Sequence, residues 1–287
     1  MRDIMQKKGK ESLGMTIDEM REKKREKGYT YEQISELSGV PLGTVQKIFS
    51  GHTRSPRYDT IRALEKVLGD YDEFQWEMRE QNIKYAVDSG QKGIPGSHKK
   101  QGEYTLEDYY ALPDDRRVEL IDGVIYDMTA PSFVHQQVCG LITGSIQQYI
   151  FRKGSKCVVS QAPTDVWLDM DDKTMVQPDV LVICDRDKLE IKRTKGAPDF
   201  VVEVLSPSTR GKDMRIKTGK YMNAGVREYW LVDLKHRRVI IHDFEQDDLV
   251  SVFTFEEKVP VMITGGDLQI DLPEIKAYLD DLFGDSW

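Results

Sequence analysis

The sequence lacks any apolar run that approaches the roughly 20 residues of a membrane-spanning helix, although 39% of its 287 residues are hydrophobic. The N-terminal stretch MRDIMQKKGKESLG has no apolar core of the kind that a secretion signal requires. We therefore expect no membrane partner and no export.

Cysteine is scarce. Cys139, Cys157 and Cys184 are an odd number and form no CxxC pair. This pattern suggests neither a disulfide framework nor a zinc knuckle. The sequence indicates a protein of the reducing cytoplasm.

Positive charge is in deficit, with 41 basic residues against 49 acidic ones and a net charge of −8. The deficit is uneven, because residues 1–60 hold 12 basic and 9 acidic residues, a net +3, which leaves −11 for the remainder. An acidic total argues against strong non-specific affinity for nucleic acid, but it leaves room for a small basic reading domain. The length suits about two domains.

Short helices with sharp ends are predicted between residues 28 and 69. Thr30 followed by Gln33 is typical of a capping box that opens a helix. Gly39 ends this helix, and Gly51 ends the next one. Further helices are expected on either side, at 16–27 and 58–68.

This pattern, with FSGHTRSPRYDTI after its core, resembles the helix-turn-helix domain of the XRE/Cro-repressor class. The resemblance implies a small all-α DNA-binding domain, residues 1–70, whose helix at 41–50 enters the major groove. It also implies contacts with bases or backbone phosphates from Leu42, Gly43, Thr44, Gln46, Lys47, Arg54 and Arg57. The alternative is a small helical bundle that serves dimerisation or protein docking.

A connecting segment is predicted at residues 71–103. Its first part could extend the helical domain, with side chains such as Ile83 and Tyr85 packing back on it; Phe74 and Trp76 belong to the same set. The stretch QKGIPGSHKKQG, 91–102, is rich in glycine, lysine and polar residues and is typical of a linker.

From residue 104 the pattern changes to strands and helices. Two short strands are expected around a turn at Asp122-Gly123, and buried strands at 178–184 and 198–205, where apolar residues dominate. The other expected elements are helices at 132–154, 212–225 and 273–283 and strands at 157–169, 227–233 and 237–244. Residues 104–287 are thus predicted to form a mixed α/β (α+β) domain with a central sheet flanked by helices.

One carboxylate accompanies each of the two buried strands, Asp179 at the start of the first and Glu203 inside the run FVVEVL of the second. A buried carboxylate must be paired, protonated, bound to a metal or placed at an edge, because its isolated burial is costly. If the strands are neighbours, the two carboxylates converge, and a hard divalent cation relieves their repulsion. Such an ion could activate water and stabilise charge on a phosphate.

The ordered set RVELIDGVIYDM, PSFVHQQV, QPDVLVI, VVEVLSPST and KTGKYMNAGVREYWLVD resembles the Uma-two family of the PD-(D/E)XK nuclease superfamily, over residues 104–285. The resemblance implies a restriction-endonuclease-like fold with a phosphodiesterase centre that uses Mg²⁺ or Mn²⁺. Asp179 and Glu203 match the metal-binding acids, and Glu119 matches the acid from the N-terminal part of the core.

The catalytic lysine departs from the plain superfamily pattern, because Leu205 stands two positions after the second acid. In the Uma-two pattern the basic residue comes from the following helix, where Lys217 fits. Lys217 shares a helical face with Asp213 and Tyr221, and it could stabilise charge on the phosphate. The competing lysines are Lys212 and Lys220.

Two accessory residues are less specific. His135, near the start of a predicted helix, could move a proton or contact phosphate, and it could equally be a capping or core residue. Asp165 could support the acidic centre or simply lie at a strand edge. Taken alone, an aspartate after proline is often a turn residue, and a helical lysine is usually solvated.

Two main functions remain open. The first is a DNA-targeted, divalent-metal-dependent endonuclease that a helix-turn-helix reader brings to its sites. The second is a DNA-binding transcriptional regulator whose C-terminal domain serves dimerisation or sensing without catalysis. A third is an antitoxin-like or phage-defence module. By analogy with readers and nucleases that work as two-fold dimers, we expect a homodimer.

Overall fold

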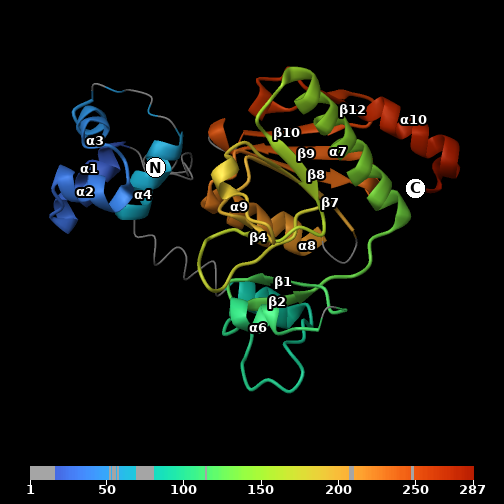
Figure 1. Cartoon of the computed structure of the whole chain (residues 1–287), viewed down its shortest axis with the longest axis horizontal. Coiled ribbons are helices and arrows are strands. Elements are labelled where there is room, and N and C mark those ends of the chain that lie inside the picture. Colours follow the sequence, from blue (N-terminus) through green and yellow to red (C-terminus); the bar gives the residue numbers. More distant parts are fainter. Residues whose placement is uncertain are drawn as a thin grey trace, which may run out of the picture. The chain divides into compact units, whose positions relative to one another are not determined.

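The structure is a computed structural model. It describes residues 17–51, 53, 56, 58–68, 81–113, 115–206, 210–246 and 249–287. The chain divides into two compact units, residues 1–76 and 77–287 (Figure 1), and the division falls inside the segment that was predicted as a connection. Each unit is described by itself.

The first unit is helical, as predicted. Thr30 and Gln33 form the expected capping box, with Thr30 Oγ1 accepting from the Gln33 N–H at 3.2 Å and Gln33 Oε1 accepting from the Thr30 N–H at 2.9 Å. The core is made by fully buried apolar side chains such as Ile34, Val45 and Leu64. The described helices are α1 (Ile17–Lys27), α2 (Tyr31–Ser38), α3 (Leu42–Phe49) and α4 (Tyr58–Leu68).

A helical stretch at residues 81–88 packs within the second unit. Asn82 Nδ2 donates to the Ile121 carbonyl at 2.8 Å, and the rings of Tyr85 and Tyr126 lie 6.5 Å apart. The expectation that Ile83 and Tyr85 pack back on the N-terminal helices is therefore wrong. Phe74 and Trp76 lie outside the described residues.

Residues 91–102, expected to be a linker, are held by hydrogen bonds within the second unit. The Ile94 N–H donates to Tyr104 Oη at 3.0 Å, and the Gly102 N–H donates to the Gly123 carbonyl at 2.8 Å. A Cβ at Gly123 would lie 2.5 Å from the Gly102 carbonyl oxygen, so this close approach requires glycine. The composition of the stretch indicated its lack of helix and strand but not these contacts.

A β-hairpin follows α6 (Leu106–Tyr110), with strands β1 (Val118–Ile121) and β2 (Val124–Asp127). Its turn is Asp122-Gly123, as predicted, and both residues have positive φ angles, 52° and 78°. Those angles match a hairpin turn that aspartate and glycine favour. The hairpin places β1, and with it Glu119, beside the helices that carry the lysines.

The central sheet has six strands in the order β10-β9-β8-β7-β5-β3. Strands β7 and β8 are parallel, and the other neighbours are antiparallel. The strands are β3 (Val158–Gln161), β5 (Val180–Ile183), β7 (Phe200–Val204), β8 (Glu228–Asp233), β9 (Arg238–Asp243) and β10 (Leu249–Thr254). Short two-stranded pairs lie outside it: β4 (Val166–Trp167) with β6 (Thr194–Lys195), and β11 (Lys258–Pro260) with β12 (Gln269–Asp271).

Helices cover both faces of the sheet, which confirms the expected α+β class (Figure 1). The helix α7 (Phe133–Lys153) packs on one face, where buried side chains such as Ile142 meet Val202 and Trp230. Alternation along β7 directs Glu203 to the opposite face, which α9 (Thr218–Ala224) covers. Before α9 come α8 (Arg210–Lys212) and a π-helical turn (Asp213–Lys217), and the helix α10 (Leu272–Phe283) packs on α7.

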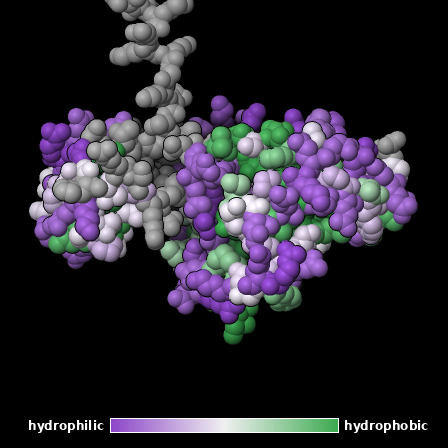
Figure 2. Space-filling model, turned by 90° about the horizontal axis from the view of Figure 1, so that it is seen from above, coloured by the Kyte–Doolittle hydropathy of each residue, from purple (hydrophilic) through white to green (hydrophobic). Residues whose placement is uncertain are grey.

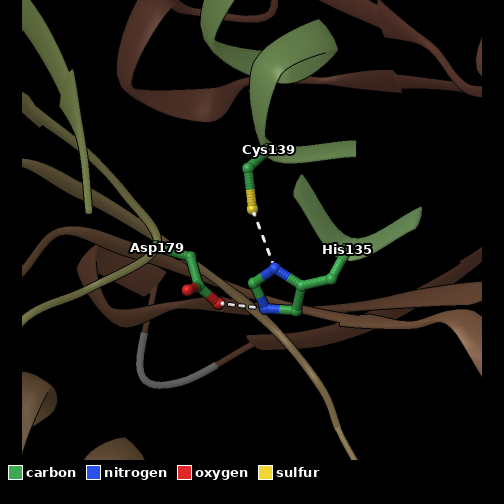
Figure 3. A group of neighbouring side chains, drawn as sticks. All are labelled: His135, Cys139 and Asp179. Carbon is green, nitrogen blue, oxygen red and sulfur yellow. Dashed lines mark hydrogen bonds and ion pairs between the residues drawn. The ribbon is translucent and has the colours of Figure 1, made fainter. Parts of the chain in front are cut away.

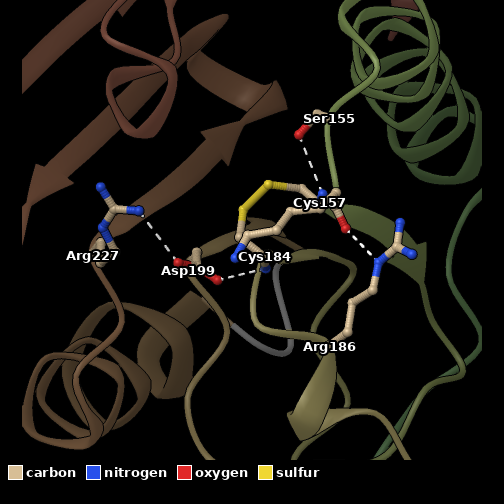
Figure 4. Close-up of a disulfide and its surroundings, with 7 residues drawn as sticks. Ser155, Cys157, Cys184, Arg186, Asp199 and Arg227 are labelled. Carbon is tan, nitrogen blue, oxygen red and sulfur yellow. Dashed lines mark hydrogen bonds and ion pairs between the residues drawn. A yellow bond between two sulfur atoms is a disulfide. The ribbon is translucent and has the colours of Figure 1, made fainter.

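A disulfide corrects the prediction from the cysteine count. Cys157 and Cys184 directly flank β3 and β5, whose register pairs Val158 with Ile183, and their sulfurs are bonded at 2.00 Å (Figure 4). The 27-residue separation in sequence carries no sign of this register, so the pair could not be inferred from spacing. Cys139 is free and buried.

The surface of the second unit is largely polar. In the view of Figure 2, hydrophilic residues cover most of the visible face, and hydrophobic ones gather in small separate areas. Among the helices that the structure describes, none combines the length and apolar character that crossing a membrane requires.

Candidate active site

The order of the strands brings Asp179 and Glu203 to one cavity. Val180, the first residue of β5, pairs with Val202 of β7, so Asp179 lies just before β5, near the position of Glu203. Both carboxylates line this cavity of 390 Å³, which Glu119 also lines. The predicted convergence of the three acids on one cleft is present.

Lys217 lies between two of these acids. Its Nζ is 2.7 Å from Glu119 Oε1 and 2.7 Å from Glu203 Oε1, and its side chain is 2% exposed. Asp213 Oδ1 lies 3.8 Å away. The Tyr221 hydroxyl donates to the same Glu203 oxygen at 2.8 Å. The shared helical face of Asp213, Lys217 and Tyr221 thus points toward Glu203, as expected.

The π-helical turn Asp213–Lys217 explains how so many polar groups reach the cavity from one short segment. A π turn holds one more residue than an α-helical turn, and such turns are frequent at functional sites. Asp213 and Lys217 at its two ends both line the cavity, and so does Lys212 just before it. This local geometry has no simple signature in the sequence.

The three candidate lysines have different partners. Lys212 forms a buried ion pair with Glu119 Oε2 and lines the cavity. Lys220 does not line the cavity but pairs with Asp122 Oδ1 at 2.8 Å and with Asp169. Only Lys217 of the three has an ion pair with Glu203 among the described contacts. The geometry therefore favours Lys217 and removes Lys220 from the site.

Asp179 is held by two donors at one oxygen. Its Oδ2 accepts from the Val204 N–H at 2.8 Å and lies 3.1 Å from His135 Nε2. His135 is buried near the start of α7, after its N-cap Ser132. The hydrogen bond to Asp179 raises the pKa of His135 against the opposing effect of burial. His135 therefore fixes the orientation of Asp179.

Cys139 lies on the other side of the same imidazole (Figure 3), with its Sγ 3.6 Å from His135 Nδ1. His135, Cys139 and Asp179 are the one set of three potential ligands within 4.8 Å of one another that the described residues contain. The ring faces Asp179 with Nε2 and the thiol with Nδ1, so one ion could not use both of these contacts. Burial also raises the pKa of the Cys139 thiol, which disfavours the thiolate that a metal needs.

Asp165 connects to the site indirectly. Its Oδ1 accepts from Gln177 Nε2 at 2.9 Å and from the Tyr109 hydroxyl at 2.8 Å. The Gln177 N–H in turn donates to Glu119 Oε1 at 2.9 Å. Asp165 does not line the cavity itself. Gln177, two residues before Asp179, was missed, and its place in QPD was the signal that could have drawn attention to it.

Burial and charge set the ionisation of the acids. Burial, with the nearby charges of Asp179 and Asp213, raises the pKa of Glu203 well above its ordinary value, although Lys217 opposes the shift. Burial also acts to raise the pKa of Glu119, but Lys212 and Lys217 outweigh it and lower the pKa. The pKa values of the two glutamates are therefore shifted in opposite directions within one cavity.

Acidic and basic side chains both line the cavity. Its acids are Glu119, Asp179, Glu203 and Asp213, and its bases are Arg117, Lys212, Lys217 and Lys235, with His135 beside them. Of these four bases, Lys212 and Lys217 are buried. The oxygens of Asp179 and Glu203 are the ligand type that Mg²⁺ and Mn²⁺ prefer, so these residues fit a hard divalent cation.

Leu205 is apolar and nearly buried at the position where the plain superfamily pattern has lysine. It lines the cavity, and its N–H donates to the Val232 carbonyl at 2.8 Å. Lys217 approaches Glu203 from the helical side instead. Although Leu205 replaces the usual lysine, Lys217 therefore still supplies a buried ammonium group to the cavity.

The helix α3 presents most of the predicted DNA-contacting residues at the surface of the first unit. Gly43, Gln46 and Lys47 are exposed, whereas Leu42 and Thr44 are half-buried. Val45 and Ile48, on the other face of the helix, are fully buried. Arg54 and Arg57 lie outside the described residues.

Two protein families match the two units. A family described as "Helix-turn-helix" matches residues 11–74. The Uma2 family, described as "Putative restriction endonuclease", matches residues 106–272.

One solved structure is similar to the second part of the chain. It is described as a putative nuclease belonging to DUF820, from Anabaena variabilis, and it has 19% sequence identity and a TM-score of 0.52. The likeness covers 61% of this chain and 98% of that one and shows a common fold. No curated protein matches the chain with significance. Since the second family match spans more than half of the 287 residues, the chain belongs to the Uma2 family of restriction-endonuclease-like proteins and carries a helix-turn-helix domain before it.

Proposed function

We propose that this protein is a DNA-targeted, divalent-metal-dependent endonuclease. The observation that carries the proposal is the pair of neighbouring carboxylates, Asp179 and Glu203, in one cavity with the buried ammonium of Lys217. A divalent cation at Asp179 and Glu203 would relieve the repulsion between these two carboxylates. The membership in a restriction-endonuclease-like family agrees with this chemistry.

The residues of the chain divide the work as follows. Asp179 and Glu203 would hold Mg²⁺ or Mn²⁺, which supplies Lewis acidity toward a phosphodiester and lowers the pKa of water. Lys217 supplies a fixed positive charge beside the reacting phosphate, and Glu119 holds Lys217 in place through the 2.7 Å contact. His135 and the Val204 N–H fix Asp179, which leaves its second oxygen for the cation.

The helix-turn-helix unit would deliver the catalytic unit to DNA. Gly43, Gln46 and Lys47 of α3 are exposed and would read the major groove. A reader raises the local concentration of DNA at a catalytic unit whose own charge is negative. We further propose a homodimer, because both kinds of domain commonly act on two-fold sites, and a cytoplasmic location, where DNA is present.

One observation favours a second function, a DNA-binding regulator without catalysis. Lys217 already forms ion pairs with Glu119 and Glu203, so these two acids have a cationic partner without a metal. A domain that has lost turnover could keep this arrangement as structure and serve dimerisation or sensing. The endonuclease proposal, in contrast, also gives a role to Asp179, which lines the same cavity.

The test is cleavage of supercoiled plasmid by the purified full-length chain with Mg²⁺, Mn²⁺ or EDTA. The endonuclease proposal expects nicked or linear product with Mg²⁺ or Mn²⁺ and none with EDTA. Cleavage that persists in EDTA would contradict the role of the metal. Binding without cleavage under every condition would favour the regulator.

A further inference from the structure

Four consecutive basic residues connect β8 to the start of β9, in a part of the chain whose net charge is negative. Lys235, His236 and Arg237 lie in the turn, and Arg238 is the first residue of β9. The turn begins with a 3₁₀ segment, Leu234–His236, and passes through Arg237 at a φ of 47°. We call residues 234–238 the basic turn. Such a cluster of positive charge in an acidic domain favours the binding of an anionic group.

The basic turn lies at the rim of the candidate active site. Strands β7 and β8 are parallel, with Glu203 paired to Leu231, so both strands end at the same edge of the sheet. The chain after β8 therefore emerges beside the end of β7. Leu234 and Lys235 line the same cavity as Glu203 and Asp179.

A single buried carboxylate holds the turn in place. Asp233 is 1% exposed, and its Oδ2 lies 2.8 Å from Arg210 Nη1, 2.8 Å from His236 Nδ1 and 3.3 Å from Arg238 Nε. The side chains of these three partners are 33%, 47% and 38% exposed. Asp233 therefore orients several cationic groups that still face solvent.

The local charge balance is positive. The basic residues here are Arg210, Lys235, Arg237 and Arg238. Asp233 pairs with two of them, and Asp280 interacts with the charge of Arg237. Arg237 also lies over the Trp287 ring at 4.6 Å, a contact that leaves its charge in place. Four acids line the cavity beside this rim. A polyanion that places one phosphate in the cavity would be repelled there unless its neighbouring phosphates meet positive charge.

We propose that the basic turn binds the DNA backbone next to the phosphate that enters the cavity. This inference rests on the proposed function for its substrate class. Arginine and lysine bind phosphate oxygens through charge-assisted hydrogen bonds, and arginine can do so with two parallel bonds. The Asp233 anchor makes the surface preorganised, so little side-chain freedom is lost when the backbone docks.

The test compares Lys235→Ala with Lys258→Ala in the full-length chain. Both lysines are exposed, but Lys258 is on β11, does not line the cavity and pairs with Asp271 at 2.6 Å. Binding of a fluorescent DNA duplex is measured in EDTA over a range of salt concentrations. Lys235→Ala should weaken binding about fivefold and lower the salt slope by about one, as for a lost phosphate contact. Lys258→Ala should change neither quantity.

The same pair is also measured with Lys47→Ala present, so that contacts from the helix-turn-helix unit do not mask the effect. Unchanged affinity and slope in Lys235→Ala in both backgrounds would overturn the proposal, and so would equal losses in the two variants. Cleavage separates this failure from failure of the endonuclease proposal. A raised KM with unchanged kcat in Lys235→Ala supports DNA binding by the basic turn. If the wild type does not cleave DNA, the endonuclease proposal fails, and the DNA affinities alone test the basic turn.

Discussion

Glu203 is 3% exposed in the middle of a sheet, a position where an isolated carboxylate would be costly. Its oxygen Oε1 receives both the Lys217 ammonium and the Tyr221 hydroxyl at hydrogen-bond distance. These partners explain how the fold tolerates the acid, whereas burial, with the neighbouring charge of Asp179, still raises its pKa. Binding of a cation would therefore stabilise the ionised form of Glu203.

Lys217 and Lys220 are a suitable pair for comparison, since each is buried and each has two carboxylates within 3 Å. Only Lys217 lines the cavity. Lys217→Met should slow Mg²⁺-dependent cleavage by about 10²–10³, because one preorganised charge in a transition state contributes that much. DNA affinity should stay within about twofold of wild type, because the charge acts mainly in the transition state.

The measurement is a cleavage time course with a thermal melt of each variant. Lys220→Met should lower the melting temperature, as the loss of a buried ion-pair partner does, but it should retain cleavage below that temperature. An equal catalytic loss in both variants would indicate a general effect of buried charge and contradict the specific role of Lys217.

Glu228 gives the fold a dependence on pH. Burial raises its pKa from the ordinary 4.5 to about 7, although Trp230 Nε1 and the Ile263 N–H donate to it at 2.7 and 2.9 Å. Because the folded state holds this proton more tightly than the unfolded state, the stabilisation is present at low pH and is lost as pH rises from about 4.5 to 7. The contribution is on the order of 3 kcal/mol.

Urea unfolding at a series of pH values measures this contribution. Glu228→Gln, which cannot ionise, should show a smaller fall in the free energy of unfolding over that window than wild type. Identical pH profiles for the two proteins would show that Glu228 has an unshifted pKa in the folded state.

At the scale of elements, local signals predicted the helices and strands that they specify directly. The Thr30 capping box, the Asp122-Gly123 turn and the apolar runs of β5 and β7 are where the sequence places them. The strands β10, β11 and β12 were missed. Exposed apolar residues in β10, such as Val250 and Val252, give no clear alternation.

The sequence predicted those parts of the candidate site that depend on which strands are neighbours. It did not predict the parts that depend on strand register or on a local change in helix winding. Asp179 and Glu203 meet because the two strands that carry them are neighbours. The choice among the lysines depends on the π-helical turn, and the bond between Cys157 and Cys184 depends on the register of β3 and β5. Neither feature has a local sequence signature.

The disulfide joins β3, an edge strand, to β5, whose N-terminal neighbour is Asp179. Its loop spans 27 residues, and closing such a loop in the unfolded chain stabilises the fold by about 2–4 kcal/mol. The double variant with Cys157→Ser and Cys184→Ser should be less stable by this amount in urea unfolding without reductant. Reductant should lower the stability of wild type to that of the variant. If reductant does not change the stability of wild type, the disulfide does not form in solution.

The helix α3 should contribute the first unit's contacts with DNA. Lys47→Ala should weaken duplex binding and reduce the salt slope by about one, because an exposed lysine that meets a phosphate releases about one counterion. Lys84→Ala, a change at an exposed lysine of the second unit, is the control. If Lys84→Ala weakens binding as much as Lys47→Ala does, α3 is not the recognition helix.

For the whole molecule, the two units combine a reader with a restriction-endonuclease-like domain in one chain. The charge is uneven along the chain, with a net +3 in residues 1–60 and −11 in residues 61–287. Under the proposed function, the acidic second unit would depend on the helix-turn-helix unit and on local basic surfaces such as residues 234–238 to approach DNA. This division makes strong salt dependence of cleavage an expected property of the intact chain.

The most direct measurement is Mg²⁺-dependent plasmid cleavage by Glu203→Gln beside Glu228→Gln. Both are buried glutamates in the neighbouring strands β7 and β8, but only Glu203 lines the cavity with Asp179. The account predicts active wild type, activity within a few-fold for Glu228→Gln and a loss of at least about 10³ for Glu203→Gln, because its carboxylate holds the cation. Equal cleavage by the two variants, or no cleavage by wild type with any divalent ion, would contradict it.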